Sequence, residues 1–139
     1  MRPATLAEAA SRLRRGEPIE KALAEFLDAF YSARDSDSAN AMLIDEPEET
    51  GDAKSDALLG AVADYLAIQF TGKRPPKWAS QPKRILAEPL FTSQSQAPAM
   101  KAWLVHNSPA EFKSHNIFTE SHPLRRKLTD RVSWVGKTE

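Results

Sequence analysis

The clearest fold signal in this chain is the stretch Pro18-Ile-Glu-Lys-Ala-Leu-Ala-Glu-Phe-Leu-Asp-Ala-Phe-Tyr31. Apolar residues recur in it at intervals of three and four, which places them on one face of an α-helix. They are Ile19, Leu23, Phe26, Leu27 and Phe30. Proline at the start suits the first turn, where an N–H has no helical partner to lose. The stretch therefore predicts an amphipathic core helix.

Two more helices are predicted from their punctuation. Thr5-Leu-Ala-Glu8 fits a capping box, in which a hydroxyl and a carboxylate satisfy the free N–H groups at a helix start. The short helix that it opens is expected to end at Gly16. Another helix is predicted over about 55–70, and Gly72 stands where a left-handed C-cap belongs.

The second half of the chain predicts a further helix from Pro98 to about Asn107. Its apolar residues Met100, Trp103 and Leu104 are expected to be buried, because they share a stripe at helical spacing. With these helices and no convincing strand alternation, the sequence predicts a mainly α protein.

The segment Ser108-Pro-Ala-Glu-Phe-Lys-Ser-His-Asn-Ile-Phe-Thr-Glu-Ser-His-Pro-Leu-Arg-Arg126 carries most of the remaining helix punctuation. Ser108 and Glu111 are predicted to form a second capping box, with Pro109 at the first helical position. Asn116 is expected to end this brief helix in the left-handed conformation.

The apolar residues of this segment are predicted to attach it to the core. Phe112 is expected to face inward, and Ile117 and Phe118 to anchor the chain after the brief helix. A final basic helical turn or helix is predicted through Leu128, and the tail 131–139 is expected to dock or fray.

Two stretches lack regular periodicity. Residues 35–54 are polar and acidic, and they are predicted to form a mobile linker. Within it, Met42, Leu43 and Ile44 form an apolar island that is expected to dock on the core. Residues 73–84 hold three prolines and five basic residues, which predicts an extended segment. Trp78 within it has two interpretations: it stacks on a base or a partner, or it pins the segment to the core. We expect 1–139 to form one helical bundle of about five or six helices with irregular Pro-rich connections.

Composition places the chain among ordinary soluble proteins. It has 139 residues, 41% of them apolar and 27% charged, and no cysteine. The absence of cysteine excludes disulfides and thiolate metal sites. No secretory signal and no apolar run of membrane-spanning length are visible, so a cytoplasmic location without membrane contact is expected.

The zero formal net charge hides two halves of opposite sign. Residues 1–70 hold 7 Lys and Arg against 14 Asp and Glu, whereas residues 71–139 hold 12 against 5. The favoured interpretation is that the halves attract each other within one domain. A nucleic-acid-binding face on the basic half is the alternative.

Catalytic and cofactor motifs are absent from the sequence. The histidines at 106, 115 and 122 are 9 and 7 residues apart, which matches no helical metal pair. Only five glycines occur, and none forms a phosphate-cradling loop. We therefore expect no metal, no cofactor and no enzymatic activity.

Several stretches in order resemble one family of small uncharacterised bacterial proteins. They are Glu17–Tyr31, Asp64-Tyr-Leu-Ala67, Pro76-Lys-Trp78, Glu88-Pro-Leu-Phe91, Ser108–Phe118 and Pro123-Leu-Arg125. Members of this family are similar to the partners of nucleotidyltransferase-type toxins in two-gene, toxin–antitoxin-like arrangements. The acidic segment 45–52 is an insertion relative to the usual family pattern.

The resemblance implies a protein-binding role, as an antitoxin or accessory subunit that binds a cognate partner encoded nearby. Opposite charge speeds encounter, so the acidic half is the expected contact for an electropositive, nucleotide-handling partner. The candidate partner-binding residues are Trp78, His115, Phe118, His122, Arg125 and Arg126.

Two other functions stay open. A DNA-binding autorepressor would place Lys73–Arg84 and Arg125–Lys127 on phosphates, although no convincing helix-turn-helix is present. An enzyme acting through His115 or His122 is the third possibility.

Overall fold

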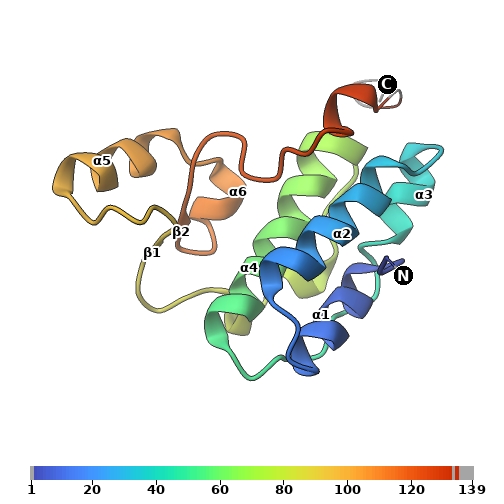
Figure 1. Cartoon of the computed structure of the whole chain (residues 1–139), viewed down its shortest axis with the longest axis horizontal. Helices are drawn as coiled ribbons and strands as arrows, with labels where there is room; N and C mark the ends of the chain where they lie inside the picture. The colour runs from blue at the N-terminus through green and yellow to red at the C-terminus, as the bar shows by residue number, and fades with distance from the viewer. Residues whose placement is uncertain (1, 133, 135–139) are drawn as a thin grey trace.

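The computed structural model describes residues 2–132 and 134, and it is built mainly from α-helices (Figure 1). The α-helices are α1 (Leu6–Arg14), α2 (Ile19–Tyr31), α3 (Ser36–Ala41), α4 (Ala53–Leu66), α5 (Pro98–Asn107) and α6 (Ala110–Lys113). Tighter or wider turns form η1 (Ala67–Thr71), η2 (Lys77–Ser80), η3 (Pro82–Arg84) and η4 (Thr129–Arg131). The two-residue strands β1 (Leu90–Phe91) and β2 (Ile117–Phe118) pair in parallel. The predicted mainly α fold is confirmed.

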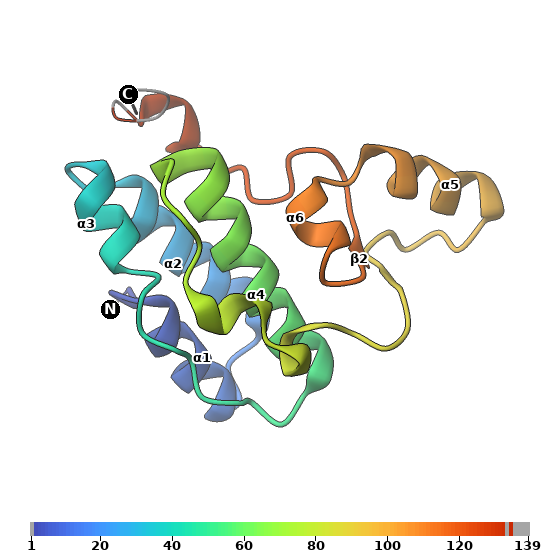
Figure 2. The same ribbon diagram turned by 180° about the vertical axis from the view of Figure 1, so that it is seen from behind.

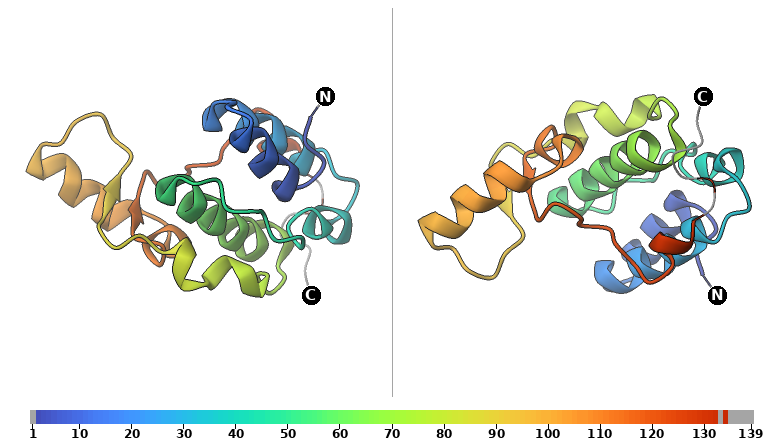
Figure 3. Two further views of the ribbon diagram at one scale, coloured as in Figure 1. Left: turned by 90° about the horizontal axis from the view of Figure 1, so that it is seen from below. Right: turned by 90° about the horizontal axis from the view of Figure 1, so that it is seen from above.

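Helix α4 is the centre of the fold. Residues 59–67 are buried without interruption, because α1 and α2 cover one side and the η2–η3 segment and α6 cover others (Figure 3). A helix that is covered on several sides is buried around most of its circumference, not only along one stripe. None of the described helices is both long and apolar enough to cross a membrane.

The first two helices form as predicted. The N–H of Glu8 donates to Thr5 Oγ1 at 3.1 Å, and the Glu8 carboxylate reaches back to the N–H of Ala4 at 2.8 Å. Gly16 ends the α1 turn with a positive φ of 96°. Helix α2 buries Phe26 and Phe30 completely, so the periodic face identified in the sequence is the core face.

Helix α4 starts two residues before the predicted helix. Asp52 is its N-cap and accepts from the N–H and the hydroxyl of Ser55, at 3.2 and 2.6 Å. These hydrogen bonds lower the pKa of Asp52. The last turn widens into the π-helical turn η1, which ends at Gly72 in the left-handed conformation, as predicted.

Gly60 lets other segments approach α4 closely. A Cβ at this position would lie 2.8 Å from the carbonyl oxygen of Ala79, 2.8 Å from His115 Cε1 and 2.9 Å from Arg84 Cβ. These atoms come from three separate parts of the chain, so one glycine sets the packing distance of the second half against α4.

The structure places a short helix, α3, within the predicted linker over 35–54. Asp35 caps α3 by accepting from the N–H of Ser38 at 2.7 Å, and Leu43 and Pro47 are buried. The predicted docking of Leu43 is therefore confirmed. The helix was missed because Ala39 is its one buried residue, which leaves no apolar periodicity to detect.

The predicted capping box at Ser108 is wrong. Helix α6 begins after Pro109 without a side-chain cap. The Ser108 hydroxyl instead accepts from the N–H of Thr119 at 2.7 Å and lies 2.9 Å from the carbonyl oxygen of the same residue. It thus closes the loop between α5 and β2. Asn116 does adopt the predicted left-handed conformation, with φ 66°, and donates from Nδ2 to Leu86 O at 3.0 Å.

Of the predicted basic helical turn or helix, the C-terminal segment forms turns followed by η4, and it docks on α2. Tyr31 donates its hydroxyl proton to Leu124 O at 2.9 Å, and burial raises the pKa of this tyrosine. Trp134 donates from Nε1 to Ala33 O at 2.9 Å and packs edge-on against Phe30. The rest of the predicted tail, 133 and 135–139, lies outside the described residues.

Candidate functional site

The opposite charges of the two halves pair with each other. Ion pairs that cross from the acidic to the basic half include Asp28–Arg126, Asp37–Lys73, Glu46–Lys83 and Asp56–Arg84. Asp64 also contacts His115. The favoured interpretation of the charge asymmetry, intramolecular attraction, is therefore confirmed. Much of the acidic half is engaged within the chain, which weakens its case as the surface for a partner.

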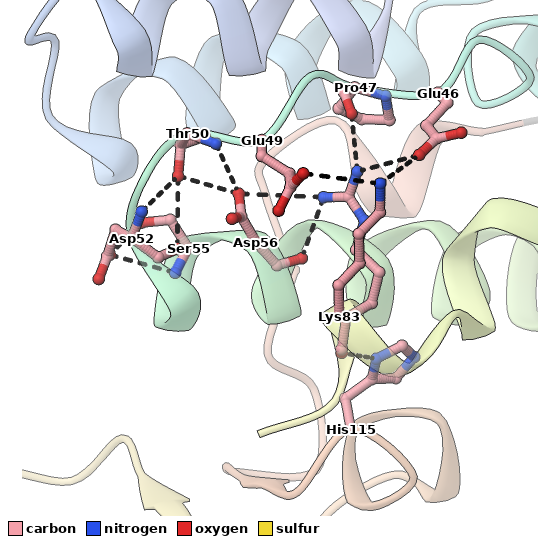
Figure 4. A network of polar contacts seen from close by, with 10 residues as sticks. Glu46, Pro47, Glu49, Thr50, Asp52, Ser55, Asp56, Lys83 and His115 are labelled. Carbon is pink, nitrogen blue, oxygen red and sulfur yellow. Dashed lines mark hydrogen bonds and ion pairs between the residues drawn. The ribbon is translucent and has the colours of Figure 1, made fainter. Parts of the chain in front are cut away.

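Arg84 has the most deeply buried cation among these contacts, since its side chain is fully buried. Figure 4 shows the polar network of this region, which includes Glu46, Pro47 and Asp56. The Nη2 of Arg84 donates to Pro47 O at 2.7 Å, and its Nη1 donates to Asp56 O at 3.3 Å. The guanidinium also lies over the Trp78 ring, 5.0 Å from its centroid. A buried charge needs such partners, because desolvation otherwise costs several kcal/mol. The predicted phosphate contact at Arg84 is thus wrong.

Trp78 is a structural residue. It is 5% exposed and donates from Nε1 to Leu43 O at 3.1 Å. Of its two interpretations, the one in which it pins the segment to the core is confirmed. The ring is covered by the protein itself, so it is not on the surface that a partner would meet in this structure.

His115 is 1% exposed, and both ring nitrogens are engaged. Nδ1 lies 2.5 Å from Arg84 O, and Nε2 lies 2.5 Å from Asp64 Oδ2. A carbonyl oxygen only accepts, so Nδ1 carries a proton and is closed to a substrate or a partner. A Ser-His-Asp triad needs one nitrogen facing the nucleophile and the other facing the carboxylate. The partner-binding assignment of His115 is corrected, and the ring is not placed as a general base.

A pocket of about 250 Å³ lies beside this pair, lined by Asp64, Ile68, Ala110, Glu111 and Ser114. The Ser114 hydroxyl donates to Glu111 O at 2.9 Å, and no described hydrogen bond joins it to His115. Glu111 Oε2 accepts from Gln69 Nε2 at 3.1 Å. Within the described part of the chain, no group of three metal-ligating side chains is found.

Arg125 and Arg126 lie together in a surface pocket of about 760 Å³ between α2 and η4. Arg2, Lys127 and Arg131 complete the cations of this basic pocket. Arg126 binds Asp28 through two hydrogen bonds of 3.0 Å, and Arg125 binds Asp130 at 2.9 and 2.7 Å. Arg2 was missed in the sequence because it lies more than 100 residues from the others along the chain.

The remaining two predicted residues lie apart from this pocket. Phe118 is half-buried in β2 and stacks on Phe91 of β1, with 5.2 Å between the ring centroids. His122 is exposed in the turn after β2. The six predicted residues therefore do not form one site.

Asp28 makes the stability of this protein depend on pH. The Arg126 guanidinium holds the pKa of Asp28 below its ordinary value of 3.8. A lowered folded-state pKa stabilises the fold above pH 3.8, and the effect disappears as the pH falls through the folded-state value. We therefore expect wild type to exceed Asp28→Asn in urea midpoint at about pH 6 and to lose that advantage at about pH 2.

The control for this prediction is Glu20→Gln, which removes an exposed carboxylate from the same helix. For this variant, the difference in urea midpoint between about pH 6 and about pH 2 is expected to be close to that of wild type. An Asp28→Asn deficit of equal size at both pH values would contradict the prediction.

Helix α5 carries a second surface feature, a set of exposed apolar side chains. It stands apart from the bundle α1–α4 (Figure 2). Leu104 is its one buried residue, whereas Trp103 is 50% exposed and Val105 is 43% exposed. The prediction that Trp103 is buried is wrong, because the described chain provides no element that covers this helix on its outer sides.

Comparisons with protein-family models, with curated proteins and with solved structures found no match to this chain.

Proposed function

We propose that this protein is a non-catalytic protein-binding module, an antitoxin-like or accessory subunit that inserts helix α5 into a groove on a partner protein encoded nearby. The observation that carries the proposal is the exposure of large apolar side chains on an outstretched helix. Trp103 and Val105 together form the main apolar surface of α5 outside Leu104.

The positions of these side chains favour a groove over a flat surface. At 100° per residue, Trp103 lies about 100° to one side of Leu104 and Val105 about 100° to the other. The helix therefore carries apolar residues around more than half of its circumference. Helices that are apolar on most sides are normally enclosed by protein. An amphipathic or apolar helix in a groove is a recurring mode of peptide recognition.

Charge narrows the chemistry of the partner. The segment 89–110, which we call the arm, contains no Asp or Glu, and its ionisable residues are Lys101 and His106. A groove with an apolar floor and carboxylates on its rim complements this surface. The resemblance to partners of nucleotidyltransferase-type toxins makes such an enzyme the first protein to test.

Trp103→Glu is expected to weaken binding to the neighbouring gene product by about 30-fold or more, because buried tryptophans carry a large share of interface energy. Its free energy of unfolding is expected to change by less than about 0.5 kcal/mol, since the side chain is half exposed in the free protein. Co-purification and calorimetric titration measure the first effect, and urea unfolding measures the second.

Ile44→Glu is the matched control, because Ile44 is 52% exposed on the body of the bundle. Equal binding by wild type and Trp103→Glu would contradict the proposal. A dimer of this chain alone that Trp103→Glu dissociates would show that the arm binds a second copy instead.

A further inference from the structure

We propose that the basic pocket between α2 and η4 binds a phosphate-bearing small molecule through Arg125, Lys127, Arg131 and Arg2. This inference goes beyond the protein-binding function, and it rests on a different surface from the arm. These four residues, together with Arg126, Leu128, Asp28 and Asp130, line one concave space of about 760 Å³. That volume lies within the usual range of small-ligand sites.

The charge of the pocket calls for an anion. Among the described lining residues, five cationic side chains stand against the two carboxylates of Asp28 and Asp130, a surplus of three positive charges. Cations gathered around a concave space raise the local concentration of anions. All five cationic side chains are exposed, so a ligand reaches them without rearrangement of the core.

The two carboxylates hold the arginines in position. Asp130 takes both of its hydrogen bonds from Nη2 of Arg125, and no described hydrogen bond engages Nε or Nη1 of that arginine. Asp28 fixes Arg126 in a similar way through Nε and Nη2. A guanidinium that is already oriented loses less conformational entropy when it binds a further anion.

A phosphate group fits this arrangement better than a carboxylate of a protein partner. Phosphate presents three acceptor oxygens and up to two charges, so it bridges several cations at once. The pocket offers little for the rest of a ligand, because Leu128 is its one apolar residue among the described lining. None of the lining residues that the structure describes is an aromatic one that could stack on a base. The recognised chemistry is therefore the phosphate group itself.

Pyrophosphate, titrated calorimetrically at low ionic strength of about 20 mM, is the probe for this site. We expect saturable binding of one molecule per chain. The double variant Lys127→Gln, Arg131→Gln is expected to weaken it about tenfold. These two residues are chosen because neither has a side-chain hydrogen bond in the described structure, so their replacement leaves the Arg125 and Arg126 contacts in place.

The control is Lys54→Gln, Lys113→Gln, which removes the same charge from exposed positions outside the pocket. Unchanged affinity of this control for pyrophosphate supports the proposed site. An equal loss of affinity in both double variants would show a diffuse charge effect and would overturn the proposal. No saturable binding of pyrophosphate also overturns it.

Two further ligands identify the source of the phosphate group. ADP binding as tightly as pyrophosphate shows that phosphate alone is recognised, and tighter ADP binding shows a contribution from the nucleoside. A single-stranded RNA that binds while pyrophosphate does not would assign the surface to nucleic acid and overturn the small-molecule proposal. Because Trp103→Glu leaves the pocket intact, failure of partner binding and failure of phosphate binding are distinguishable.

Discussion

Arg84→Ala is expected to lower the free energy of unfolding by about 3–5 kcal/mol, the range for removing one member of a buried charge network. The guanidinium is completely buried and donates to the carbonyl oxygens of Pro47 and Asp56. Its loss leaves these acceptors without a donor and opens a cavity beneath the Trp78 ring. The Asp56 carboxylate, 4.0 Å from Nη1, also loses its nearest buried cation.

Urea unfolding of three variants separates these contributions. Lys83→Ala removes the neighbouring cation, which lies at the surface and pairs with Glu46 at 2.9 Å, and it is expected to cost less than about 1 kcal/mol. Arg84→Lys keeps the charge but loses the planar group that donates in two directions. Its loss of unfolding free energy is therefore expected to lie between those of Arg84→Ala and Lys83→Ala. Equal losses for Arg84→Ala and Lys83→Ala would show that the buried network contributes no more than a surface ion pair.

Gly60→Ala is expected to lower the free energy of unfolding by about 2–3 kcal/mol, although alanine is the better helix former. The added Cβ would lie within 2.9 Å of the Ala79 carbonyl oxygen, His115 Cε1 and Arg84 Cβ. Two of these atoms belong to, or attach directly to, the backbone, so relief of the clash requires η2 and η3 to move away from α4.

The sign of the change in unfolding free energy of Gly60→Ala distinguishes two expectations. Helix propensity alone predicts that Gly60→Ala stabilises the protein by about 1 kcal/mol. Close packing predicts the opposite, and Gly60→Ser should be worse than Gly60→Ala because its side chain is larger. A stabilised Gly60→Ala variant would mean that the second half of the chain does not pack on α4 at the distance described.

Local punctuation in the sequence predicted much of the helical framework. The capping pair Thr5 and Glu8, the left-handed residues Gly72 and Asn116, and the bounds of α5 all formed as expected. These features depend on residues within one turn of each other, so a single stretch contains all the information they need. Ser108 shows the limit of that reasoning. Its hydroxyl binds Thr119, 11 residues later, in preference to the nearby helix start.

The candidate surfaces could not be predicted in the same way. Arg125 and Arg126 were singled out from the sequence, but the pocket they share with Arg2 depends on how the C-terminal segment docks on α2. Trp103 shows the converse case. Helical spacing marked it as an apolar residue of a helix, and burial was inferred from that. Exposure depends on whether another element covers the helix, which spacing does not report.

By itself, the sequence determined that this protein is a mainly α chain with defined helix starts and ends, because helices and caps arise from contacts between near neighbours. The tertiary structure decided which polar residues are buried and which apolar residues are exposed. His115 meets Asp64 across 51 residues, and Arg84 meets Pro47 across 37. Such pairs are set by how α4 packs against the second half of the chain. Whether a charge is buried with partners or a tryptophan is left exposed therefore depends on the assembled tertiary structure.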